Sequence, residues 1–184
     1  KMGVEIVYFS PIHDKFLPKN INGLILGGGY PELYAKELSN NKSMKESIYN
    51  EINNGLITIA ECGGFMYLHE NMEDINGISY EMVGIIKGKS YKTSKLNRFG
   101  YINIKALEDN FLCKKDEIIK GHEFHYFDST NCGEKFFAEK PSKKRSWKCI
   151  NLTNNLFAGY PHIHFYSNLN VPYNFIKACK NYNY

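Results

Sequence analysis

A cysteine on a tight turn is the residue of this sequence best placed to do chemistry. Cys62 follows an apolar run, residues 56–60, and precedes Gly63, Gly64 and an apolar pattern with helical spacing. A strand, a glycine-rich turn and a helix in this order make a nucleophile elbow. The helix N-terminus directs N–H groups and a positive dipole end at the sulfur, which favours the thiolate. The structural alternative is a buried core cysteine.

Two histidines late in the chain could supply the base that such a thiol needs. The stretch 156–166 predicts a strand, and His162 and His164 stand two apart in it, so they would share one face. A histidine at a strand end can serve as a general base at neutral pH. A cysteine followed far downstream by histidine is how a thiol–imidazole dyad often looks in a sequence.

A second histidine-bearing stretch, residues 121–126, reads GHEFHY. On a strand, His122 shares a face with Phe124, while Glu123 and His125 share the other face. The stretch is either an ordinary half-buried strand or the start of a metal site. Because no fourth ligand stands nearby in the sequence, we expect no metal.

A glycine-rich loop follows the predicted strand 21–26. Three glycines, residues 27–29, precede Tyr30 and Pro31, and they let the backbone approach a ligand closely. Neither a P-loop nor a G-x-G-x-x-G signature is present. The loop could instead supply backbone N–H groups that donate hydrogen bonds to an oxyanion.

The surrounding pattern predicts an α/β fold with a mostly parallel sheet. Strands at 4–9, 21–26 and 56–60 alternate with a helix at 43–53, which is typical of parallel α/β proteins. Both glycine turns would then lie at the carboxyl edge of the sheet, where such folds bind ligands. The second half predicts an antiparallel extension with strands at 83–86, 101–106, 123–127, 135–138 and 147–152, before a closing helix at 171–182.

Composition is consistent with one globular domain of 184 residues, 43% of them hydrophobic. No apolar run approaches the ~20 residues of a membrane span, and no signal-peptide pattern opens the chain. Five widely spaced cysteines argue against a disulfide framework or zinc site, so we expect a reducing cytoplasm. The net charge is only +4, and a basic cluster is interpreted as a solvated loop rather than a nucleic-acid site: Lys140, Lys143, Lys144 and Arg145.

Four motifs in order carry a family resemblance. GGGYPE, AECGGFMYL, GHEFHY and GYPHIHF resemble the carboxyl-terminal class I glutamine amidotransferase domain of the cobyrinic acid a,c-diamide synthase family. The resemblance covers nearly the whole chain and implies a flavodoxin-like three-layer core. It implies that the domain, residues 1–184, hydrolyses glutamine to supply ammonia for amidation of the a and c carboxylates of a corrin precursor in cobalamin biosynthesis.

Carried over residue by residue, the resemblance assigns roles. Cys62 would be the nucleophile, and Gly63 with Gly28 or Gly29 would form the oxyanion hole. His162 would be the base. Many relatives carry a glutamate two residues after this histidine, but here that position is His164, which stays a rival base.

The resemblance also implies partners. ATP and magnesium would belong to a separate amino-terminal P-loop domain, whose motif this chain lacks, and the glutaminase domain needs no cofactor. An exposed sheet edge near the amino end would favour pairing with another chain, of which a homodimer is one form. Hydrogenobyrinate and nickel sirohydrochlorin are alternative acceptors, and a non-catalytic binding module is the alternative function.

Overall fold

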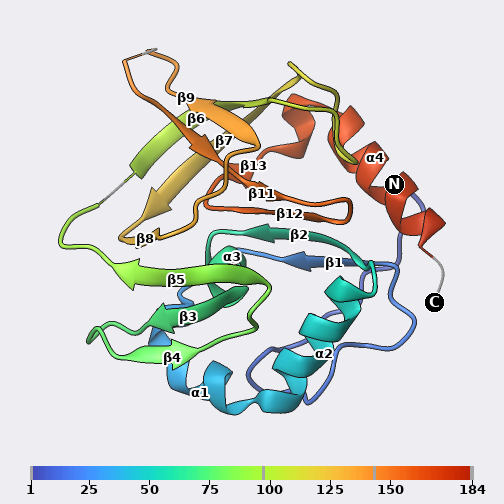
Figure 1. Cartoon of the computed structure of the whole chain (residues 1–184). Coiled ribbons are helices and arrows are strands. Elements are labelled where there is room, and N and C mark those ends of the chain that lie inside the picture. The colour runs from blue at the N-terminus through green and yellow to red at the C-terminus, as the bar shows by residue number, and fades with distance from the viewer. Residues whose placement is uncertain (1, 97, 143, 183–184) are drawn as a thin grey trace.

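The computed structural model describes residues 2–96, 98–142 and 144–182 of the chain. Its centre is a sheet in the order β1-β2-β12-β11, shown in Figure 1. The strands β1 (Gly23–Leu26), β2 (Ile57–Glu61) and β12 (Leu156–Gly159) are parallel, and β11 (Asn151–Leu152) runs antiparallel to β12. The predicted parallel strands at 21–26 and 56–60 are therefore confirmed, each shifted by a residue or two.

Helices cover both faces of this sheet. One face packs against α1 (Ala35–Asn40), α2 (Lys42–Asn53) and α3 (Gly63–Tyr67), where buried Met44, Ile48 and Phe65 share a core with Leu56. A short 3-10 helix, η1 (Pro31–Leu33), precedes α1. The other face packs against α4 (Asn170–Asn181) through Val171. The predicted three-layer α/β core is confirmed.

Two further sheets follow where an antiparallel extension was predicted. The first, in the order β10-β9-β6-β7-β13, comprises β10 (Ser146–Cys149), β9 (Phe136–Glu139), β6 (Arg98–Ala106), β7 (Ile118–His125) and β13 (His162–Ile163). The second, in the order β4-β3-β5-β8, comprises β4 (Ser79–Glu81), β3 (His69–Glu73), β5 (Ile86–Lys92) and β8 (Phe127–Ser129). The first of these sheets is antiparallel throughout, but the second contains one parallel pair, β3 with β5. The strand predicted at 83–86 is wrong, because β5 begins only at Ile86. The strands predicted at 123–127 and 147–152 are each divided between two sheets, as β7 and β8 and as β10 and β11.

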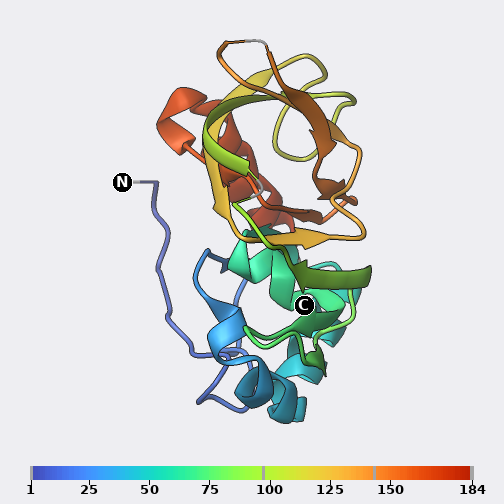
Figure 2. The same ribbon diagram turned by 90° about the vertical axis from the view of Figure 1, so that its left-hand side faces the viewer.

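The strand predicted for residues 4–9 is also wrong. The segment has the alternation of a strand but pairs with none of the described strands, and Val4, Ile6 and Tyr8 are more than half exposed. Figure 2 shows this part of the chain running extended along the outside of the molecule before β1. A suitable sequence forms a strand only where a neighbouring strand accepts its hydrogen bonds.

The strand predicted over residues 156–166 is broken in two. After Gly159 the chain turns at Tyr160 and Pro161, leaves the parallel sheet and joins β7 as β13. A second 3-10 helix, η2 (Phe165–Ser167), follows directly. His162 and His164 therefore do not lie on one regular strand, as the sequence pattern suggested.

Two further findings concern membrane spans and the basic cluster. Within the described residues, no helix is long and apolar enough to span a membrane. Of the basic cluster, Lys144 and Arg145 are exposed, consistent with a solvated loop, and Lys143 lies outside the described residues.

A fully buried histidine beside the core predicts acid sensitivity. Because the Phe65 carbonyl can only accept, His69 Nδ1 donates to it at 2.9 Å, and Nε2 accepts from the Ser129 hydroxyl at 2.6 Å. Burial lowers the pKa of His69 to about 4. As the pH falls, this histidine is protonated in the unfolded chain at a higher pH than in the folded protein. The contribution of neutral His69 to the free energy of unfolding is therefore complete above about pH 6.5 and is lost as the pH falls toward 4.

We expect this histidine to cost about 2 kcal/mol of unfolding free energy between pH 7 and pH 5. Urea unfolding of the wild type and of His69→Gln at both pH values measures it: the pH-dependent loss should be about 2 kcal/mol smaller in the variant. His13→Gln, at an exposed histidine, is the matched control and should lose as much as the wild type. Equal losses in all three proteins would contradict the assignment.

Candidate active site

The elbow after β2 holds Cys62 in a conformation that few residues adopt. Its φ of 48° and ψ of −103° place it at positive φ, which is unusual for a residue with a side chain. Two contacts hold the turn: the Cys62 N–H donates to Gly159 O at 2.9 Å, and the Gly64 N–H donates to Gly27 O at 3.0 Å. A Cβ on Gly64 would lie 2.2 Å from the Leu26 carbonyl oxygen, so glycine is required there.

The glycine loop after β1 packs directly against this elbow. A Cβ on Gly63 would lie 2.9 Å from Gly29 N, so the two backbones touch. Leu26 and Ala60 are register partners, which confirms the prediction that both turns lie at the same sheet edge. Gly63 is the first residue of α3, and its N–H has no acceptor within that helix. The elbow and the loop thus bring backbone N–H groups close to the sulfur.

His162 enters this edge from β13, beyond the turn at Pro161. A Cβ on Gly28 would lie 2.3 Å from His162 Cε1, so a side chain on the loop would displace the ring. A hydrogen-bonding interaction with the Cys62 sulfur, followed by one with Glu61, raises the pKa of His162 to about 10 against the opposing effect of burial. At neutral pH the ring is therefore a cation beside the Cys62 side chain.

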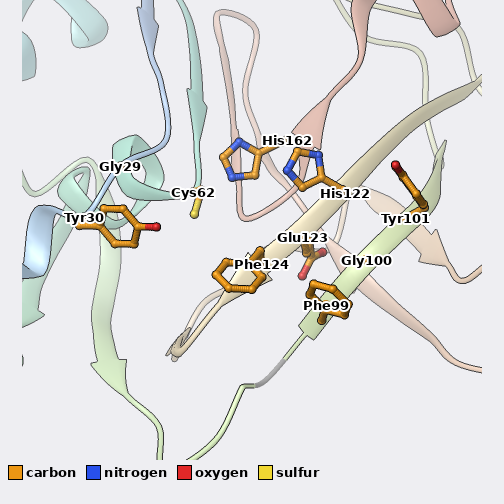
Figure 3. Close-up of a pocket in the computed structure, with 10 residues that line it drawn as sticks. All are labelled: Gly29, Tyr30, Cys62, Phe99, Gly100, Tyr101, His122, Glu123, Phe124 and His162. Atoms are coloured by element: carbon orange, nitrogen blue, oxygen red, sulfur yellow. The ribbon is translucent and has the colours of Figure 1, made fainter.

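A pocket of about 570 Å³ opens in front of these residues. Figure 3 shows Cys62, His162 and His122 facing it, with Tyr30 and Phe124 at its border. The remaining lining comes from the loop and from β6 and β7: Gly29, Phe99, Gly100, Tyr101 and Glu123. The site combines a candidate nucleophile, a cationic ring and backbone donors with room for a small substrate, an arrangement that suits acyl transfer.

Of the sequence-predicted site residues, His164 is the one placed apart. It is exposed, precedes η2, and does not line the pocket. Its backbone N–H donates to Lys120 O at 2.9 Å, and its ring lies beside Tyr166 with centroids 6.1 Å apart. The structure brings Cys62, Gly28, Gly29, Gly63 and His162 together at one edge.

Two residues at the site were missed from the sequence. His122 stacks on His162 with ring centroids 4.7 Å apart and planes 10° apart, because β7 and β13 pair these positions. Burial and then the charge on His162 lower the pKa of His122. Glu61, the residue before Cys62, places its Oε2 atom 3.6 Å from His162 Nδ1. The sequence feature that could have identified Glu61 is a charged residue at the end of an otherwise apolar strand.

The other half of the GHEFHY stretch forms a buried polar network. Glu123 Oε2 lies 2.8 Å from His125 Nε2, and its Oε1 accepts from Trp147 Nε1 at 3.1 Å. The His125 ring stacks on Tyr160 at 3.9 Å, whose hydroxyl lies 3.1 Å from Ser90 Oγ. In the described part of the chain, no three or more His, Cys, Asp or Glu side chains gather as a metal site. Through the stacking of His125 on Tyr160, this network connects β7 to the turn that precedes His162.

The sequence of this chain is similar to a known protein family and to individual members of it. The family described as the CobB/CobQ-like glutamine amidotransferase domain matches residues 1–169. Among individual relatives, a cobyrinate a,c-diamide synthase of Caldanaerobacter subterraneus subsp. tengcongensis is 38% identical over 99% of this chain and 41% of its own length. The enzyme of the same name from Picrophilus torridus is 44% identical over 97% of this chain and 38% of its own length. The chain thus spans about two fifths of these curated relatives.

Solved structures agree on the fold. The crystal structure of a glutamine amidotransferase superposes with a TM-score of 0.60 at 11% identity, over 88% of this chain and 81% of that one. PurLQS from Thermotoga maritima superposes with a TM-score of 0.50 at 15% identity, over 86% and 79%. With the family match across most of its length and the shared fold, the chain belongs to the CobB/CobQ-like glutamine amidotransferase domain family.

Proposed function

We propose that this chain is the glutaminase part of a cobyrinate a,c-diamide synthase. The observation that carries the proposal is the Cys62 elbow, with His162 and two glycine turns at one sheet edge. The similarity to cobyrinate a,c-diamide synthases over nearly the whole chain supports the choice of acceptor. Chemistry that depends on a reduced thiol favours the cytoplasm as its compartment.

The reaction begins with the Cys62 thiolate. The sulfur attacks the side-chain amide carbon of glutamine, and the N–H groups of Gly63 and of Gly28 or Gly29 stabilise the oxyanion that forms. His162, a cation at neutral pH, donates its proton to the departing ammonia and leaves a glutamyl thioester. The neutral ring then takes a proton from water, which attacks the thioester and releases glutamate.

The ammonia would be used by a synthetase domain of the kind that accounts for the rest of a longer synthase. That domain would bind ATP and magnesium, activate the a and c carboxylates of the corrin precursor, and receive ammonia from this chain. The glutaminase steps need no cofactor, since the thiol, the imidazole and the backbone donors supply the nucleophile, the proton transfers and the oxyanion stabilisation.

The experiment follows the amide nitrogen of glutamine. With [amide-¹⁵N]glutamine, ATP, magnesium and the matching synthetase part, we expect the label in the amidated product of cobyrinate, detected by mass spectrometry. Hydrogenobyrinate and nickel sirohydrochlorin offered in parallel identify the acceptor. Release of glutamate without transfer to any of them would contradict the proposed acceptor class, and failure to release glutamate would contradict the glutaminase itself.

A further inference from the structure

The carboxylate that usually orients a catalytic histidine is absent from its expected place. Two residues after His162 stands His164, an exposed imidazole outside the pocket. Without a partner, the His162 ring could rotate about its side-chain bonds, and the proton could occupy either nitrogen. A cysteine–histidine pair works best when a third group fixes the ring.

We propose that Glu61, the residue immediately before the nucleophile, is the positioning residue for His162. The proposal rests on the proposed function, in which His162 transfers protons at Cys62. Glu61 ends β2 and is the register partner of Gly159 at the end of β12, three residues before His162. The turn at Pro161 therefore returns the histidine to the strand end that carries the glutamate.

Both oxygens of the Glu61 carboxylate are engaged. Oε1 accepts from the Ile163 N–H at 3.0 Å, which anchors the carboxylate to the backbone of β13. Oε2 faces His162 Nδ1 at 3.6 Å, an ion-pair distance. The anchor is the residue next to His162, so the carboxylate is held by the same short strand that carries the ring. The remaining ring nitrogen is then free to serve the substrate side of the site.

The other titratable groups around His162 are not placed to orient its ring. The Cys62 sulfur is the reacting atom, and His122, stacked on the ring face, can be only neutral or cationic. The further titratable groups of the pocket are Tyr30, Tyr101 and Glu123. Glu123 is occupied by His125 and Trp147. Among the described residues, Glu61 is the carboxylate at ion-pair distance from His162.

The test combines NMR with kinetics. In protein labelled at histidine, His162→Gln assigns the His162 signal. We expect Glu61→Gln, which keeps an oxygen for the Ile163 N–H but removes the charge, to lower the pKa of His162 by about one pH unit. The glutaminase kcat should fall at least about tenfold, less than the ~10²–10⁴-fold of the proton-transferring residue itself. KM should stay within about threefold, because Glu61 acts through His162.

Two variants control the result. Glu61→Asp keeps the charge and should recover much of the pKa and the kcat. Glu134→Gln removes one carboxylate from an exposed ion pair with Lys148 and should change neither. A folded Glu61→Gln protein with an unchanged His162 pKa, or with kcat within twofold of the wild type, overturns the proposal. If the wild type releases no glutamate, the proposed function fails, and the NMR titration still decides whether Glu61 pairs with His162.

Discussion

Replacing Cys62 with alanine is expected to lower glutamine hydrolysis by at least ~10³-fold, because no other group at the site can form the thioester. The backbone donors would remain, so glutamine should still bind. Release of glutamate, followed over hours at high enzyme concentration, measures the loss. Cys179→Ala, at a half-buried thiol in α4, is the matched control and should retain the wild-type rate.

Covalent labelling tests the same cysteine without turnover. A diazo-ketone analogue of glutamine should modify Cys62 first, since it combines a glutamine-shaped group with an electrophile. Burial raises the pKa of Cys113, Cys132 and Cys179 to about 11, and raises that of Cys149 further, so these four remain thiols near neutral pH. Peptide mapping identifies the labelled residue. First labelling at any of the four would show that the nucleophile is misassigned.

The parts of the fold predicted best from sequence are those with local signals. The strand–turn–helix around Cys62 is defined by an apolar run, two glycines and helical spacing, all within a dozen residues. The glycine loop after β1 also has a local signature, since three glycines follow a short apolar run and precede Pro31. Both lie at one sheet edge because parallel strands end together. The family resemblance added the roles, and the positions of Gly28, Gly29 and Gly63 are consistent with it.

The errors arose where pairing over long distances decides the structure. The alternation of residues 4–9 satisfies a strand pattern, but a strand also needs a neighbour, which sequence periodicity does not reveal. The stretch 156–166 is apolar and aromatic enough for one strand. Pro161 lacks an N–H for a ladder, and the chain there exchanges one sheet for another. Glu61 and His122 were missed for the same reason: each meets His162 only through that exchange.

The broken strand favours His162 over His164 as the candidate base. On one continuous strand either ring could have reached the sulfur, whereas in the structure His162 lines the pocket together with Cys62 and His164 is exposed beside Tyr166. His162→Ala should therefore lower the glutaminase rate by roughly 10²–10⁴-fold, since the thiol loses both its cation and its proton donor. His164→Ala should leave the rate within about twofold, as expected for an exposed side chain away from the chemistry.

The two alanine variants are matched, because each removes one imidazole and the two positions are only two residues apart. Steady-state glutamate release gives kcat and KM for each, and thermal unfolding shows whether both are folded. The labelling rate of Cys62 should fall in His162→Ala, because the sulfur then lacks the neighbouring imidazole that activates it. It should be unchanged in His164→Ala. A larger loss in folded His164→Ala would make His164 the base, and would require the segment after β13 to move toward the pocket when glutamine binds.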